Sequence, residues 1–255
     1  MIKSICIETF FRELDFYDRF ESVAKLGVEY VEFWTWPGKD IKRIKELLKK
    51  YNLKIASISG DFKFTPFVLE ERADYLKYLA ESIEVAKELG CLNLVIHSNG
   101  MEKGIVFNDG SQMSMAKKFA SMTRTFMEAA ALAEKAGVKL VLEAISDISI
   151  PHYLVTKTQD SGDIARVVGS PNFKILYDTW HMQQMEGNMV RNITEYFDVI
   201  GYVHIGDCPE RHEPGTGEIN FDRIKKTLVD LGYDGIYGLE LEPSLPSSES
   251  AKWTW

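Results

Sequence analysis

Four short apolar runs decide the fold of this chain: LVLEA (140–144), ILYDTWH (175–181), GYVHIGD (201–207) and GLELEP (238–243). Each run reads as a buried strand, and each ends on a side chain that can bind a metal ion. The runs are separated by about one strand-plus-helix unit, so a barrel of parallel strands would bring their carboxyl ends to one mouth. The sequence therefore predicts a cluster of acids and histidine at that mouth.

The same pattern extends over the whole chain. Strands are expected at Lys3–Ile7, Tyr30–Trp34, Lys54–Ser59, Asn93–His97, Lys139–Ala144, Lys174–Asp178, Tyr202–Ile205 and Ile236–Leu241. In several of these strands the residues that face either side are apolar. This is expected when helices cover one side of a strand and a packed barrel interior covers the other. Amphipathic helices fill the intervals: one spans residues 115–137 and ends at Gly137, and another begins after the N-cap Asn220. A short last helix at SSES (247–250) is expected to carry Trp253.

This alternation predicts an α/β fold, a single-domain TIM (β/α)8 barrel over residues 1–255. The competing architecture is an open doubly wound sheet. Such a sheet usually has a glycine-rich turn after its first strand, and IETFFREL (7–14) has none. No low-complexity linker interrupts the chain.

Composition narrows the function classes. A chain of 255 residues that is 45% hydrophobic can bury a full core, and its net charge of -8 disfavours nucleic acid as a partner. Three cysteines are too few for a disulfide framework or a thiolate zinc cluster, which favours the cytoplasm. No apolar run reaches the length of a membrane span, and no secretion signal is evident. The expected partner is a small molecule.

The candidate metal ligands are Glu143, Asp178, His204 and Glu240, all at strand ends. One such acid alone is commonly a helix N-cap or a solvated charge. Four in register favour a metal site, because charges that converge at a barrel mouth repel unless a cation neutralises them. Oxygen donors with one imidazole favour Mn²⁺, with Mg²⁺, Co²⁺ and Zn²⁺ as alternatives.

Three segments resemble a known group: KILYDTWHMQQMEGN (174–188), YVHIGDCPERHEPGTGEINF (202–221) and GYDGIYGLELEPS (232–244). They are similar to the hydroxypyruvate isomerases within the sugar isomerase and epimerase superfamily of metal-dependent TIM barrels. That superfamily also contains ketose epimerases and xylose isomerase. The resemblance is detailed over roughly the last hundred residues and colinear before them, and HEPGTGEI together with WHMQQMEG is its most specific part.

The resemblance implies a role for each candidate. One divalent ion would be bound by Glu143, Asp178, His204 and Glu240. Glu143 and Glu240 would also exchange substrate protons, and His181 and Arg211 would contact substrate oxygens. His97, at the end of LVIH, is a further candidate for substrate binding. The family is often dimeric or tetrameric, so a homodimer or homotetramer is implied.

The residue types fit this chemistry without the family name. Hydrogen transfer between adjacent carbons of an α-hydroxy carbonyl compound passes through an enediolate, whose oxygens a divalent ion can stabilise. Two carboxylates can then act as general base and acid. No nucleophile is needed, and the sequence has no nucleophile elbow or phosphate loop.

One segment departs from the family. Hydroxypyruvate isomerases usually read Glu-Pro-Ile-Asn-Thr-Arg-Asp-Ile-Pro, whereas this chain reads EAISDISIP (143–151), with Ile148 in place of the arginine. An arginine there would suit a carboxylate or phosphate, so its loss leaves room for a neutral sugar.

The first hypothesis is isomerisation of hydroxypyruvate to tartronate semialdehyde; the alternative is a ketose 3-epimerase of the tagatose/psicose type. An endonuclease IV-like phosphodiesterase is disfavoured by only five histidines, and a non-catalytic barrel by the presence of both proton-transfer acids.

Two further features have two interpretations each. Trp34, Trp36 and Phe62 follow the second and third strands, where they could cover a substrate ring or only pack under loops. The EPGTGE segment (213–218) could hold a phosphate through its backbone amides or form only a turn.

Overall fold

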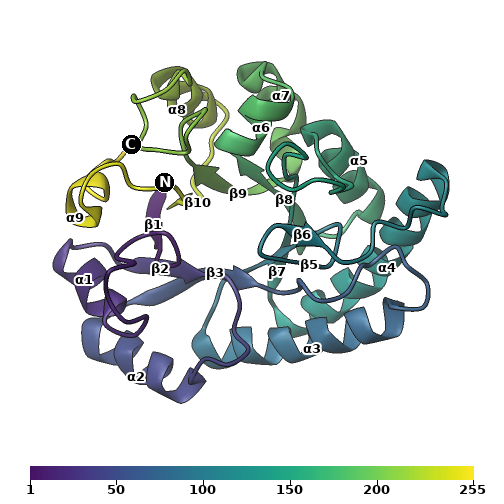
Figure 1. Ribbon diagram of the computed structural model, residues 1–255, viewed down its shortest axis with the longest axis horizontal. Helices are drawn as coiled ribbons and strands as arrows, with labels where there is room; N and C mark the ends of the chain where they lie inside the picture. The colour runs from purple at the N-terminus through teal and green to yellow at the C-terminus, as the bar shows by residue number, and fades with distance from the viewer.

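A closed barrel of parallel strands, ringed by helices, forms the centre of the computed structural model, which describes residues 1–255 (Figure 1). The barrel strands are β1 (Ile2–Cys6), β2 (Tyr30–Phe33), β3 (Lys54–Ser59), β4 (Asn93–Ile96), β7 (Lys139–Glu143), β8 (Phe173–Asp178), β9 (Ile200–Ile205) and β10 (Ile236–Leu239). The last strand closes the barrel by pairing with the first. The TIM barrel prediction is confirmed, and every predicted strand lies within two residues of the observed one at each end.

The helices cover the outside of the barrel (Figure 1). They are α1 (Arg19–Lys25), α2 (Ile41–Tyr51), α3 (Arg72–Leu89), α4 (Met115–Ala136), α5 (Thr158–Val168), α6 (Thr179–Met185), α7 (Met189–Tyr196), α8 (Phe221–Asp230) and α9 (Ser247–Ser250), with a 3-10 turn at Phe197–Val199. As predicted, Asn220 caps α8 by accepting from the Arg223 amide, and Gly137 ends α4 in the left-handed region at φ 68°. The placement of Trp253 in the last helix is wrong: α9 ends at Ser250, and the indole packs beyond it against Phe221.

A small antiparallel hairpin, β5 (Met101–Glu102) with β6 (Ile105–Val106), follows β4 and was not predicted. Strands of two residues are too short to show an alternating pattern. None of the helices is both long and apolar enough to cross a membrane.

The direction of the side chains along the strands decides where the site lies. One cluster of buried residues is separate from the main core and lines the barrel interior: Ala56, Val95, Val141, Leu176, Tyr202 and Ile236. Side chains alternate along a strand, so residues two positions later face the same way. Glu143, Asp178 and His204 each follow a member of this interior cluster by two positions. The intervening residues, such as Leu142 and Tyr177, pack in the larger core beneath the helices.

Candidate metal centre and active site

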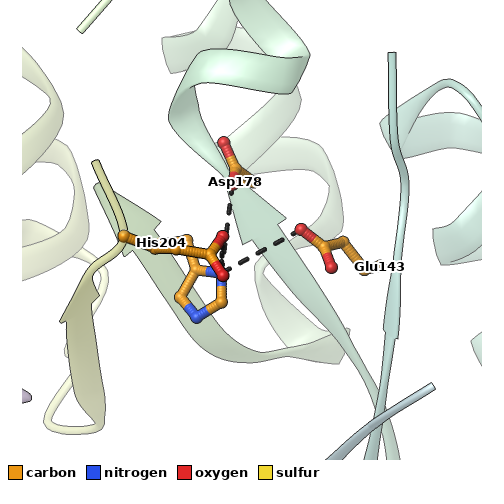
Figure 2. Close-up of side chains that lie close together, drawn as sticks. Glu143, Asp178 and His204 are labelled. Carbon is orange, nitrogen blue, oxygen red and sulfur yellow. Dashed lines mark ion pairs between the residues drawn. The ribbon is translucent and has the colours of Figure 1, made fainter. Parts of the chain in front are cut away.

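The four predicted ligands lie together at the barrel mouth. Glu143, Asp178, His204 and Glu240 are all buried, and each offers one ligand atom within 4.8 Å of those of the others. Their strands, β7 to β10, are four consecutive neighbours in the barrel. Figure 2 shows Glu143, Asp178 and His204 turned toward one another from adjacent strands. The Nδ1 atom of His204 lies 3.2 Å from Glu240, 3.9 Å from Asp178 and 4.0 Å from Glu143.

Asp178 uses its two oxygens for different tasks. It is the last residue of β8 and the N-cap of α6, where Oδ1 accepts from the His181 amide at 3.0 Å. Oδ2 faces the cluster and accepts from Nη2 of Arg211 at 2.7 Å. Burial raises the pKa of Asp178, but Arg211 and the neighbouring histidines outweigh burial and hold it below its usual value. The helix-cap and metal-ligand interpretations are therefore compatible.

Arg211 neutralises part of the cluster. Its Nη2 atom donates to Asp178 and also to Oε2 of Glu240 at 2.5 Å, and its guanidinium lies 4.8 Å from the centre of the Trp180 ring. The backbone of Arg211 is left-handed, at φ 62°. Gly206 leaves the necessary space, because a Cβ there would lie 2.9 Å from Cγ of Arg211. Arg211 thus lines the cavity, and its Nη2 atom donates to the carboxylates of Asp178 and Glu240. Contact between Arg211 and a substrate stays a prediction.

The two candidate proton carriers have opposite environments. Glu240 accepts from Arg211 and, through Oε1, from the indole N–H of Trp34 at 2.5 Å. Burial raises the pKa of Glu240, but His204 and Arg211 hold it well below the usual range. No hydrogen bond reaches the carboxylate of Glu143, and the nearest histidine nitrogens lie 3.7 to 4.0 Å from its oxygens. Burial, and next the charge of Glu240, raise the pKa of Glu143 to about 7.

His181 is a neutral donor. The Ser146 amide donates to its Nδ1 atom at 3.2 Å, so the ring proton is on Nε2, which lies 3.9 Å from Glu143. Burial lowers the pKa of His181 to about 4. At neutral pH this side chain can therefore donate a hydrogen bond into the cavity without carrying charge.

His97 also faces the site, and it has a partner that the sequence did not reveal. Its Nδ1 atom lies 2.8 Å from the buried carboxylate of Asp61, which also accepts from the hydroxyl of Tyr75 at 2.6 Å. The Nε2 atom of His97 lies 3.7 Å from Glu143. Burial lowers the pKa of His97, but Asp61 more than compensates and the net shift is upward.

These residues surround a cavity of about 630 Å³. Trp34 and Phe62 form part of its wall, whereas Trp36 stacks on Tyr78 and does not line it. Among the lining residues only Arg211 and Lys103 are lysine or arginine, and Lys103 comes from the β5–β6 hairpin. Sequence reasoning missed Lys103 because nothing local marks the hairpin.

The turn interpretation of EPGTGE is correct. The amides of Gly215 and Gly217 donate to Oδ2 of Asp207 at 2.8 and 2.9 Å, so a side chain of the protein already takes the place of an anion. Nearby Cys208 is buried, and burial raises the pKa of its thiol to about 11, so it is not a reactive group.

The cluster fits a divalent cation. Neither ring nitrogen of buried His204 has a hydrogen-bond partner, and its Nδ1 faces three carboxylates. One guanidinium balances only part of their charge. Carboxylate oxygens with one imidazole suit Mn²⁺ or Mg²⁺, and also a catalytic zinc.

Comparisons with known proteins show the family of the chain. The family described as xylose isomerase-like TIM barrel matches residues 20–254. The chain is 30% identical over 250 residues to a hydroxypyruvate isomerase of Escherichia coli, covering 95% of this chain and 94% of that one. It is 30% identical over 251 residues to a 2-oxo-tetronate isomerase of Haemophilus influenzae, with the same coverage.

Among solved structures, an AP endonuclease of family 2 from Brucella melitensis superposes with a TM-score of 0.88 at 23% identity, covering 99% of this chain and 97% of that one. At that identity the likeness concerns the fold alone. The family match and the two relatives, which extend over nearly the whole sequence, show that the chain belongs to the xylose isomerase-like TIM barrel family.

Proposed function

We propose that this protein is a metal-dependent isomerase that moves hydrogen between adjacent carbons of a small hydroxy-keto acid. Conversion of hydroxypyruvate to tartronate semialdehyde is the first reaction to test. Relatives named as isomerases, at 30% identity over 95% of the chain, support the isomerase class. The observation that carries the proposal is the contrast between Glu143 and Glu240, because environments that push two carboxyl pKa values apart mark an acid–base pair.

Glu143, Asp178, His204 and Glu240 would hold the ion. When bound, a divalent ion would polarise the substrate carbonyl, stabilise negative charge on the substrate oxygens and favour the ionised forms of its carboxylate ligands. The oxygen-rich donor set favours Mn²⁺.

Glu143 is the residue best suited to move the proton. Its carboxylate opens to the cavity and accepts no hydrogen bond from the protein, so its oxygens are free to accept a substrate proton and to return one. It would take the proton from the carbon that bears the hydroxyl group and return one to the neighbouring carbonyl carbon. Glu240 is ionised and accepts hydrogen bonds from Trp34 and Arg211. We assign it the second place in proton transfer, after Glu143. His181 would donate from Nε2 to a substrate oxygen.

An acidic substrate needs a cation, and Lys103 is the one available. Arg211 already contacts two carboxylates, whereas Lys103 lines the cavity and forms no ion pair. Its backbone is left-handed, at φ 50°, at the tip of the hairpin. We assign to Lys103 the contact with the substrate carboxylate that an arginine at position 148 would otherwise make.

The alternative is a ketose 3-epimerase. It is favoured by the exposed Ile148 in place of arginine and by the aromatic wall of Trp34 and Phe62, which suits the apolar face of a neutral sugar. The two functions differ in their need for Lys103.

The test uses the full chain, stripped of metal with a chelator and reconstituted with Mn²⁺. Hydroxypyruvate, 2-oxo-tetronate, tetruloses, pentuloses and hexuloses are assayed in deuterated water. We expect turnover of an acid that depends on metal and incorporates solvent deuterium. Turnover of neutral ketoses alone would favour the epimerase, and undiminished turnover in metal-free protein would refute the metal-dependent mechanism.

A further inference from the structure

A further carboxylate lies behind the cluster, in the barrel interior. Glu32 on β2 is only 2% exposed. Its Oε2 atom accepts from the hydroxyls of Tyr202 and Ser57, the latter at 3.2 Å. Its Oε1 atom has no hydrogen-bond partner and lies 3.3 Å from Nε2 of His204. His204 therefore lies between Glu32 on one side of its ring and the cluster on the other.

His204 is the one group that can balance the negative charge of Glu32. No lysine or arginine forms an ion pair with this carboxylate. A buried carboxylate without compensation is strongly destabilising, so this position depends on the two hydroxyl donors and the imidazole. Core packing alone would be better served by an apolar side chain.

The barrel also leaves room for this carboxylate. Gly238 on β10 is the register partner of His204, and a Cβ at Gly238 would lie 2.3 Å from Oε1 of Glu32. Any larger residue at position 238 would push the carboxylate away from the ring. The absence of a side chain there allows Glu32 to reach Nε2.

We propose that Glu32 is a positioning residue for His204. It accepts a hydrogen bond from the Nε2–H group, which fixes the proton on that nitrogen and leaves the lone pair of Nδ1 directed at the metal. Histidines that bind metals commonly donate their other N–H to a carboxylate, which orients the ring and raises its basicity. This inference rests on the proposed function in one respect, namely that the cluster binds an ion.

Glu32→Gln tests the inference sharply because the two hydroxyls determine how the amide turns. Tyr202 and Ser57 both donate, so they select the amide oxygen, and the amide NH₂ then faces Nε2 of His204. That nitrogen would have to accept, and the ring proton would move to Nδ1, the atom that faces the metal. Mn²⁺ affinity should fall by about 10- to 100-fold, the range typical of losing such a partner.

The affinity is measured by titrating MnCl₂ into the metal-free full chain in a calorimeter, with circular dichroism and a thermal melt as checks of folding. Tyr202→Phe is the matched control: it removes one hydroxyl donor and keeps the carboxylate, so it should bind Mn²⁺ much as the unaltered protein does. Equal affinity of Glu32→Gln and the unaltered protein would overturn the inference while leaving the metal site intact. Failure of the unaltered protein to bind would overturn both.

A second measurement does not depend on a variant. In the unaltered protein labelled with ¹⁵N-histidine and loaded with Zn²⁺, the spectrum should show His204 protonated at Nε2, with a downfield proton that signals the hydrogen bond to Glu32. Tyr202→Phe should keep the Nε2 proton and its downfield shift, whereas Glu32→Gln should lose the Nε2 proton signal. An unprotonated Nε2 in the unaltered, Zn²⁺-loaded protein would refute the inference even if Glu32→Gln did not fold.

Discussion

Asp207→Asn should loosen the loop that carries Arg211. Asp207 is 1% exposed. Its carboxylate accepts hydrogen bonds from four backbone amides: Oδ1 accepts from Cys208 and Ile219, and Oδ2 accepts from Gly215 and Gly217. The distances are 2.8 to 3.0 Å. An asparagine keeps the shape but replaces one acceptor oxygen with an NH₂ group, so two of the four amides lose their acceptor.

The loss of stability depends on which two of the four hydrogen bonds the asparagine cannot accept. The carbonyl oxygen should stay with Cys208 and Ile219, which are buried, and the NH₂ should face Gly215 and Gly217, which water reaches. Hydrogen bonds to a charged group contribute about 1.5–3 kcal/mol each. Because water can partly replace the two lost bonds, we expect destabilisation of about 2 kcal/mol, or about 4–8 °C in melting temperature for a chain of this size.

The assay is differential scanning calorimetry of the metal-free chain. Asp222→Asn is the control, since it removes one exposed negative charge near the start of α8 without disturbing these amides. A second readout is the affinity for Mn²⁺, which should rise as Arg211 loses its fixed place, because the guanidinium and the ion compete for the oxygens of Asp178 and Glu240. A melting temperature for Asp207→Asn equal to that of the control would refute the role assigned to this carboxylate.

Three other predictions address catalysis, specificity and stability. Glu143→Gln should still fold and should bind Mn²⁺ more weakly, because it removes one proposed ligand charge; at saturating Mn²⁺ it should lose at least about a hundredfold in turnover, together with exchange of a substrate proton with deuterated water, and near-native exchange would assign the proton to another group. Lys103→Met should raise the KM for acidic substrates while Lys103→Arg largely restores it, and an unchanged KM would remove Lys103 from the binding site. Burial raises the pKa of Glu213, but hydrogen bonds from Ser250 and Ser244 outweigh burial and lower it below its ordinary value of 4.5. Its contribution to stability is therefore present above pH 4.5 and lost as the pH falls through the lower folded pKa, so Glu213→Gln should reduce the melting temperature at pH 7 and converge with the parent in acid; a constant difference across pH would contradict this.

Local patterns were sufficient for the elements. A strand is marked by a short apolar run, and a helix by its period and caps, so Asn220, Gly137 and the strand ends could be read from neighbouring residues. The β5–β6 hairpin could not, because two residues show no period. The prediction that the last helix carries Trp253 was wrong, because a helix of one turn has no periodic pattern that marks where it ends.

The sequence by itself determined the barrel and the four residues that meet at its mouth, because in a parallel barrel the end of every strand comes to the same face. It could not determine the partners of those residues. The indole of Trp34 reaches Glu240 across 206 positions of sequence, and Glu32 approaches His204 only because the closed barrel brings β2 and β9 across a shared interior. The opposite pKa shifts of Glu143 and Glu240 likewise depend on burial and on which oxygens are hydrogen-bonded. Such contacts exist only once the barrel closes, since they join residues that no local pattern connects.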